Sequence, residues 1–193
     1  MVVLRPHPST PEDAWQVSAL ATRAPGGELH LRYVLQGALH AIRLPPPGAG
    51  LRADRLWEHT CAEAFIAAEG ADGYVELNVA PSRAWAAYAF ATYRERAPIE
   101  TSALDPRIAV QCERDAITFD VAVAPADLSP AYREATLRVG LSMVVEASDG
   151  RLTYWALHHP SAQPDFHHAD GFVLRLPPPA AQQDSDARRG PSS

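Results

Sequence analysis

The sequence contains no lysine, only two cysteines and no apolar run long enough to cross a membrane. Its basic residues are all arginines, and acidic residues outnumber them 23 to 17, which gives a net charge of −6. This balance argues against nucleic acid or an anionic membrane surface as the main partner. Because a transmembrane helix needs a run of about 18 apolar residues, none is predicted.

The two cysteines, Cys61 and Cys112, exclude a disulfide framework and do not have the spacing of a zinc site. We expect both to be reduced thiols, as in the cytoplasm. The segment Met1–Trp15 has no basic stretch followed by an apolar run, so no signal peptide is predicted. The expected localisation is therefore cytoplasmic, with no membrane partner.

The length of 193 residues suits one domain whose core needs no metal or disulfide. Residues 1–176 carry the apolar patterns and are predicted to form this domain. Residues 177–193 begin with three prolines and continue as a polar stretch. Such a composition buries too little apolar surface to fold, so this tail is predicted to be disordered.

Alternation of apolar and polar residues predicts short strands separated by turns. About ten strands with few helices predict an all-β fold, an immunoglobulin-like antiparallel β-sandwich. Arg83–Arg94 fits a helix or a strand, and we favour the strand because the many alanines reflect a compositional bias. One helical turn is predicted within Ala126–Glu134. The other strand candidates are Val17–Arg23, Leu29–Leu35, Leu39–Leu44, Ile108–Cys112, Ile117–Val123, Leu137–Val145, Leu152–Leu157 and Phe172–Leu176.

Ala62–Ala67 and Tyr74–Val79 form the most informative predicted hairpin. One register places every polar side chain on one face and every small aliphatic side chain on the other. A slip by one residue would destroy this sorting, so the register is well specified. It pairs Ala67 with Tyr74, Phe65 with Glu76 and Glu63 with Asn78, and on the other face Ile66 with Val75, Ala64 with Leu77 and Ala62 with Val79.

A second hairpin is predicted where Asp149-Gly150 separates two alternating runs. Asp-Gly in this position is typical of a two-residue turn. With such a turn, Trp155 and Val144 share one face of the hairpin, and Tyr154 and Val145 share the other.

Two blocks of the sequence carry motifs beyond the strand pattern. The first contains Trp57-Glu58, Cys61, Glu63-Ala64-Phe65, Tyr74-Val75-Glu76-Leu77-Asn78, Pro81-Ser82 and Trp85-Ala86-Ala87-Tyr88. The second contains Leu141-Ser142, Asp149-Gly150, Tyr154-Trp155-Ala156-Leu157, His159-Pro160 and Pro164-Asp165-Phe166-His167-His168. Together they resemble the DOMON-like family, small bacterial proteins related to family 9 carbohydrate-binding modules. The resemblance implies a β-sandwich that holds a sugar or a haem on a concave face.

The polar face of the first hairpin is the strongest candidate for a binding site. Glu63, Glu76 and Asn78 can accept hydrogen bonds from sugar hydroxyls, and the two carboxylates are expected roughly 5–8 Å apart. The same residues suit a solvated outer sheet face, a catalytic carboxylate pair or a calcium site, and nothing in the sequence singles out an acid and a nucleophile. The candidate ligand-binding residues are Trp57, Glu63, Tyr74, Glu76, Asn78, Trp85, His159 and His167.

Two histidine pairs, His158-His159 and His167-His168, flank one loop. Neutral imidazoles can bind zinc or iron, but adjacent strand residues point to opposite faces, so hydrogen bonds that anchor the loop are favoured over a metal site. Haem-carrying relatives use methionine and histidine ligands. Beyond the initiator, the only methionine is Met143, which lies in an apolar strand where a core position is expected. Ligation by two histidines stays open.

The sequence therefore predicts a non-catalytic, carbohydrate-binding-like β-sandwich whose partner is a sugar or another small molecule. The alternatives are a glycan-acting or peptidoglycan-related enzyme, a haem-binding module, or a protein-interaction module with an exposed aromatic patch and no pocket. No cofactor is expected, with haem and calcium as the open alternatives. No nucleic-acid partner is expected, and the oligomeric state is not predicted.

Overall fold

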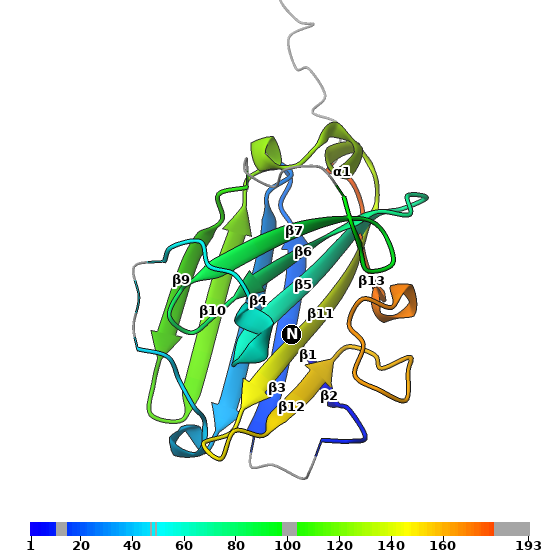
Figure 1. Cartoon of the computed structure of the whole chain (residues 1–193). Coiled ribbons are helices and arrows are strands. Elements are labelled where there is room, and N and C mark those ends of the chain that lie inside the picture. Colours follow the sequence, from blue (N-terminus) through cyan, green and yellow to red (C-terminus); the bar gives the residue numbers. More distant parts are fainter. Residues whose placement is uncertain (11–14, 47, 49, 98–103, 180–193) are drawn as a thin grey trace, which may run out of the picture.

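The computed structural model describes residues 1–10, 15–46, 48, 50–97 and 104–179. Across these residues two antiparallel β-sheets pack face to face as a sandwich (Figure 1). The predicted all-β sandwich is confirmed. The described strands number thirteen rather than about ten, because three of them have only two residues each and are too short to show an alternating pattern.

The smaller sheet has the strand order β1-β3-β4-β10-β9. Its long strands alternate buried and more exposed residues, so one face packs into the core and the other meets solvent. Four of the predicted strands lie here. The bounds are β1 (Val2–Val3), β3 (Trp15–Arg23), β4 (Leu29–Gly37), β9 (Arg107–Cys112) and β10 (Ala116–Val123).

The larger sheet has the order β2-β12-β11-β5-β6-β7-β8, and β13 also pairs with β11. Arg83–Arg94, which fitted a helix or a strand, contains strand β7, so the favoured interpretation is confirmed. The bounds are β2 (Arg5–Pro6), β5 (Cys61–Ala68), β6 (Tyr74–Val79), β7 (Trp85–Thr92), β8 (Glu95–Arg96), β11 (Leu137–Glu146), β12 (Leu152–Ala156) and β13 (Leu174–Leu176).

Helices are short. The predicted turn within Ala126–Glu134 is present as the 3-10 helix η3 (Pro125–Asp127) followed by α1 (Pro130–Glu134). The other 3-10 helices are η1 (Leu39–Ala41), η2 (Leu56–Glu58) and η4 (Ala169–Gly171). None of the helices in the described part of the chain is long and apolar enough to cross a membrane.

The hydrophobic core lies between the two sheets, where Tyr33, Phe119 and Met143 are almost fully buried. Strand β5 differs from the strands of the smaller sheet because all eight of its residues are buried. Its outer face is covered as well, by a second apolar cluster that includes Phe65 and Phe172. A segment that includes Phe172 therefore packs on the outer face of the larger sheet at β5.

The register predicted for β5 and β6 is confirmed at all six pairs, including Glu63 opposite Asn78 and Phe65 opposite Glu76. This success has a physical reason. Alanine, isoleucine, leucine and valine fill the core face, so no other register buries them together. The three polar residues Glu63, Glu76 and Asn78 consequently share the outer face.

The register predicted for β11 and β12 is wrong by one residue. Val144 pairs with Tyr154, and Met143 pairs with Trp155. The loop has three residues, since Ala147 N–H donates to Arg151 O and Gly150 sits at φ 88° as the left-handed residue of the turn. A two-residue turn at Asp149-Gly150 would have shifted every pair, but the sandwich does not depend on this register.

Three other expectations need correction or stay open. The strand predicted at Leu39–Leu44 is wrong, because the chain forms η1 there and only Ile42 bridges to Ala147. Gly37, at φ 130°, ends β4 just before this turn. The last strand begins at Leu174 rather than Phe172. Of the predicted tail, residues 180–193 lie outside the described residues, so the domain boundary at 176 stays a prediction.

Candidate binding cleft

Residues 157–172 (the roof segment) cross the outer face of the larger sheet and appear in orange in Figure 1. The Phe172 ring stacks on Phe65, with centroids 5.8 Å apart. This close approach needs glycine at position 140, because a Cβ there would lie 2.8 Å from Cδ1 of Phe172. Packing of aromatic residues thus holds the roof segment against the sheet.

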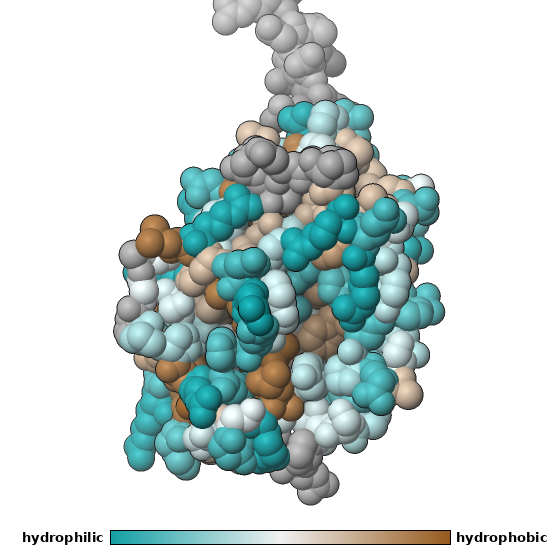
Figure 2. Space-filling view, in the orientation of Figure 1, coloured by the Kyte–Doolittle hydropathy of each residue, from teal (hydrophilic) through white to brown (hydrophobic). Residues whose placement is uncertain are grey.

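A cleft of about 450 Å³ opens beside the roof segment on this outer face. Glu63, Phe65 and Glu76 contribute from the strands, and Trp57 and Phe166 contribute from the loops. Hydrophilic side chains cover most of this face, with apolar residues visible between them (Figure 2). A concavity of this size, lined by aromatic rings and a few polar groups, suits a small organic ligand.

Two buried carboxyl groups lie in the cleft, Glu63 at 3% and Glu76 at 4% exposure. The Asn78 side-chain amide donates a hydrogen bond of 2.6 Å to Glu76 Oε1. Among the described residues, Glu63 Oε1 has no hydrogen-bond partner. Burial raises the pKa of both carboxyls. The charge of Glu76 raises that of Glu63 further, whereas Asn78 and two arginines counteract the rise at Glu76.

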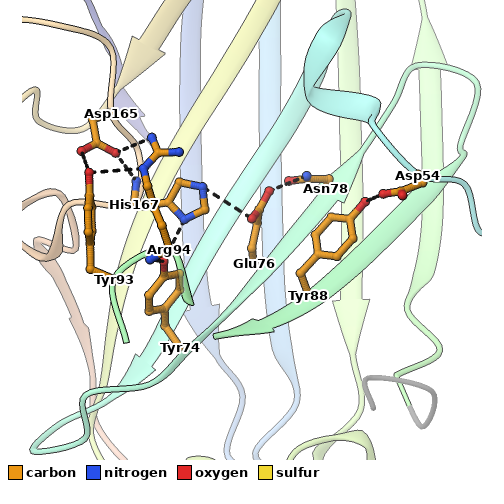
Figure 3. A network of polar contacts seen from close by, with 9 residues as sticks. All are labelled: Asp54, Tyr74, Glu76, Asn78, Tyr88, Tyr93, Arg94, Asp165 and His167. Carbon is orange, nitrogen blue, oxygen red and sulfur yellow. Dashed lines mark hydrogen bonds and ion pairs between the residues drawn. The ribbon is translucent and has the colours of Figure 1, made fainter. Parts of the chain in front are cut away.

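His167 extends from the roof segment to the same floor (Figure 3). Its Nδ1 lies 2.8 Å from the Tyr74 hydroxyl, which accepts a hydrogen bond from the Arg94 backbone N–H. We assign the hydroxyl proton to this contact with Nδ1, which puts the proton of a neutral imidazole on Nε2, 3.8 Å from Glu76 Oε2. Burial lowers the pKa of His167 to about 4, which keeps the ring neutral near pH 7.

A polar network ties the roof segment to the turn between β7 and β8 (Figure 3). Arg94 donates to Asp165 Oδ1 at 2.9 Å, and the Tyr93 hydroxyl donates to Asp165 Oδ2 at 2.7 Å. The Asp165 carboxylate in turn accepts the backbone N–H of His167. This arrangement fixes the position of His167 relative to the sheet.

Aromatic and cationic side chains form the other edge of the cleft. The Arg96 guanidinium lies 3.8 Å from the centre of the Tyr88 ring, and Trp57 meets the same ring edge-on at 5.5 Å. The Tyr88 hydroxyl donates to Asp54 (Figure 3). The loop that carries Asp54 and Trp57 is thus tied to β7.

The structure brings six of the eight predicted site residues together. Four of them line the cleft directly, and Tyr74 and Asn78 support it through hydrogen bonds to His167 and Glu76. The six residues are Trp57, Glu63, Tyr74, Glu76, Asn78 and His167.

Two predicted site residues lie elsewhere. Trp85 pairs with Val79, so its side chain belongs to the core face, and its placement near the polar face is wrong. The Arg52 guanidinium stacks on it, 4.9 Å from the ring centre. His159 does not line the cleft; its Nε2 lies 2.8 Å from Arg5 O, a contact that anchors the roof segment to β2.

Sequence reasoning missed the two arginines and part of the aromatic lining, Tyr154 and Phe166. Arg94 and Arg96 come two residues apart in the β7–β8 hairpin, and Arg94 has a left-handed backbone at φ 56°. No spacing in the sequence connects this hairpin with Glu63 or Glu76. Tyr154 and Phe166 both stand within motifs of the family resemblance, and those motifs are the available signal for them.

Met143, His159 and His167 are not placed to ligate a haem. Met143 is fully buried between the sheets. His167 uses Nδ1 in a hydrogen bond and directs Nε2 toward Glu76, and His159 uses Nε2 on the backbone. The described residues contain no cluster of three or more histidine, cysteine or acidic side chains suited to a metal ion.

No protein-family model and no curated protein matches the chain. Solved structures do match. A proposed carbohydrate-binding protein from Bacteroides uniformis aligns with a TM-score of 0.61 at 17% identity, over 90% of this chain and 85% of that one. A family 9 carbohydrate-binding module from Caldicellulosiruptor kristjanssonii, in complex with cellotriose, aligns with a TM-score of 0.57 at 8% identity, over 99% and 86%.

The same kind of module from Caldicellulosiruptor kristjanssonii in complex with glucose aligns with a TM-score of 0.55 at 6% identity, over 90% of this chain and 83% of that one. Identities this low carry the fold and not the ligand. The chain therefore has the β-sandwich fold of family 9 carbohydrate-binding modules.

Proposed function

We propose that the protein binds a saccharide in the cleft beside the roof segment, as the resemblance to DOMON-like proteins implies. The observation that carries this proposal is the unpaired Glu63 Oε1, buried at the floor of an open cleft. A buried carboxyl with an unpaired oxygen costs about 1–3 kcal/mol, and a ligand hydroxyl on the cleft side of Glu63 can recover part of this cost. Such groups are rare in folded proteins unless they serve a ligand, a water or a reaction.

The rest of the cleft supports the same ligand class. Glu63 and Glu76 accept hydrogen bonds, and the Nε2–H of His167 donates one, so the floor can match adjacent hydroxyls of a sugar ring. Trp57 and Phe166 offer flat apolar surfaces at the sides. Sugar rings have apolar faces that stack on such side chains, and hydroxyls at their edges.

Isothermal titration with D-glucose, D-galactose and cellotriose tests the proposal. We expect at least one of them to bind, and Glu76→Gln to weaken that sugar about tenfold or more because an acceptor is lost. Glu69→Gln is the matched control, since Glu69 is exposed and pairs with Arg175 away from the cleft. Absence of binding by all three sugars would contradict the proposal, as would equal affinity of Glu76→Gln and the wild type.

A further inference from the structure

Glu63 and Glu76 face one cleft from unequal surroundings. Glu76 accepts the Asn78 amide and is close enough to Arg94 and Arg96 for their charges to act on it. All three favour the ionised carboxylate. Glu63 Oε1 meets no donor among the described residues and lies beside the negative charge of Glu76.

This asymmetry distributes one proton between the two groups. Burial raises the pKa of both groups and neighbouring buried carboxyls resist joint ionisation, so the pair favours a state that holds a single proton. The donors gathered around Glu76 leave that proton on Glu63. A carboxylic acid and a carboxylate then stand in one site, which is the pattern of a general acid and a general base.

The two groups also approach a ligand from the same side. Glu63 on β5 and Glu76 on β6 occupy diagonal positions of adjacent paired strands and project from one sheet face. Glycoside hydrolysis instead requires its carboxyls to flank the bond on opposite sides of the sugar. A pair on one face suits a reaction in which both proton transfers occur at one edge of the ring.

We propose that the cleft interconverts the α and β anomers of a bound reducing sugar, with Glu76 as general base and Glu63 as general acid. This inference rests on the proposed saccharide binding and adds a reaction to it. The hydroxyl oxygen and the ring oxygen of a hemiacetal are bonded to the same anomeric carbon, so an adjacent acid and base can reach both.

Each turnover begins with ring opening. Glu76 removes the proton from the anomeric hydroxyl, and the electron pair of that O–H bond forms the carbonyl double bond. The bond between the anomeric carbon and the ring oxygen breaks, its electron pair goes to the ring oxygen, and that oxygen takes the proton of Glu63.

Ring closure reverses these transfers. After the aldehyde rotates about its bond to the next carbon, the former ring hydroxyl attacks the other face of the carbonyl. Its proton returns to Glu63 while Glu76 gives its proton to the carbonyl oxygen. No water, metal or second substrate is consumed, and both side chains end as they began.

Polarimetry of freshly dissolved α-D-glucose and α-D-galactose provides the test. We expect a rate of anomer exchange that rises in proportion to protein concentration above the spontaneous rate. Glu63→Gln and Glu76→Gln should each reduce the protein-dependent rate about 10²-fold, because an amide neither donates nor accepts the proton. Glu69→Gln should leave it unchanged. Circular dichroism of each variant verifies that it is folded.

The pH profile distinguishes catalysis from a structural role. The rate should follow a bell, because the singly protonated pair exists only between its two apparent pKa values. The other titratable or charged groups that line the cleft are Glu58, Arg94, Arg96, Tyr154 and His167. Of these, His167→Gln should alter the height of the bell and leave both limbs in place.

Three outcomes overturn the inference and remain distinguishable. Binding of glucose or galactose without faster exchange rejects the reaction and leaves the proposed binding function intact. Absence of both binding and acceleration with these sugars and cellotriose rejects the reaction together with the proposed function. Acceleration that survives in both carboxyl variants also rejects the assigned roles.

Discussion

Two buried glutamates on the larger sheet differ in their hydrogen-bond partners. Glu146, at the end of β11, receives Arg43 at 2.7 Å on one oxygen and His59 at 2.7 Å on the other. Glu63, on neighbouring β5, is just as buried and has an oxygen with no partner among the described residues. Both carboxyl groups lost hydrogen bonds to water on folding. Only Glu146 has protein partners that replace these hydrogen bonds on both of its oxygens.

The difference separates a structural carboxylate from a candidate functional one. A buried charge that is fully hydrogen-bonded holds segments together, and here Glu146 connects β11 with the loops that carry Arg43 and His59. A buried carboxyl left unpaired makes folding less favourable. Under the proposed function, the missing partner of Glu63 is a ligand in the cleft.

Glu146→Ala should show the largest loss of stability. Two charge-assisted hydrogen bonds disappear, and the free energy of unfolding should fall by about 1–3 kcal/mol. Urea denaturation followed by tryptophan fluorescence measures the change. If the variant is as stable as the wild type, Glu146 does not have the structural role that the comparison assigns to it.

His167 should make the protein sensitive to acid. Its pKa is about 4 in the folded state and 6.5 in the unfolded chain, so the unfolded state binds more protons between these values. Stability is therefore lost as pH falls through this window, by about 2 kcal/mol after allowance for solvent screening. Denaturation midpoints at pH 7 and pH 4 should differ less in His167→Gln. Parallel pH curves for the two proteins would contradict this assignment.

Glu63→Gln should have the opposite sign from Glu146→Ala. The pKa of Glu63 is raised well above 4.5, so the folded state binds more protons than the unfolded state above that pH. Wild-type stability therefore falls as pH rises through this window, and the variant escapes the loss. We expect the variant to gain stability relative to the wild type at pH 7 compared with pH 4. A loss of stability in Glu63→Gln at pH 7 would show that the carboxylate is structurally paired.

The two tryptophans of the first motif block should separate binding from folding. Trp57 is half-buried at the cleft, so Trp57→Ala should change stability by less than about 1 kcal/mol. The same variant should weaken sugar binding measurably in the titration. Trp85→Phe changes a buried core residue and should leave affinity for the sugar unchanged. If Trp85→Phe weakened sugar binding and Trp57→Ala did not, the sugar would not bind on the outer face of the larger sheet.

The features of the structure that depend on local sequence pattern could be predicted from the sequence alone. The β5–β6 register followed from apolar sorting, and it placed Glu63, Glu76 and Asn78 on one face. Trp85 was assigned to the polar face because it belongs to the same motif block as the site residues. Its pairing with Val79 places it on the core face instead. The contacts of Arg94, Arg96 and the roof segment join distant parts of the chain, so no local pattern encodes them.

The β11–β12 register illustrates a smaller limit. Asp149-Gly150 indicates a turn, but the same dipeptide occurs in loops of two and of three residues. The three-residue loop is defined by the left-handed backbone of Gly150 and by the hydrogen bond from Ala147 N–H to Arg151 O. A turn motif therefore located the hairpin without fixing which side chains meet across it.

A crystal structure grown with saturating D-glucose or cellotriose tests the central claim most directly. We predict a sugar ring in the cleft, with one hydroxyl hydrogen-bonded to the Glu63 carboxyl and another to Glu76, and with Trp57 or Phe166 against an apolar sugar face. Ordered waters that satisfy Glu63 while the sugar is absent, or a sugar bound only elsewhere on the surface, would contradict it.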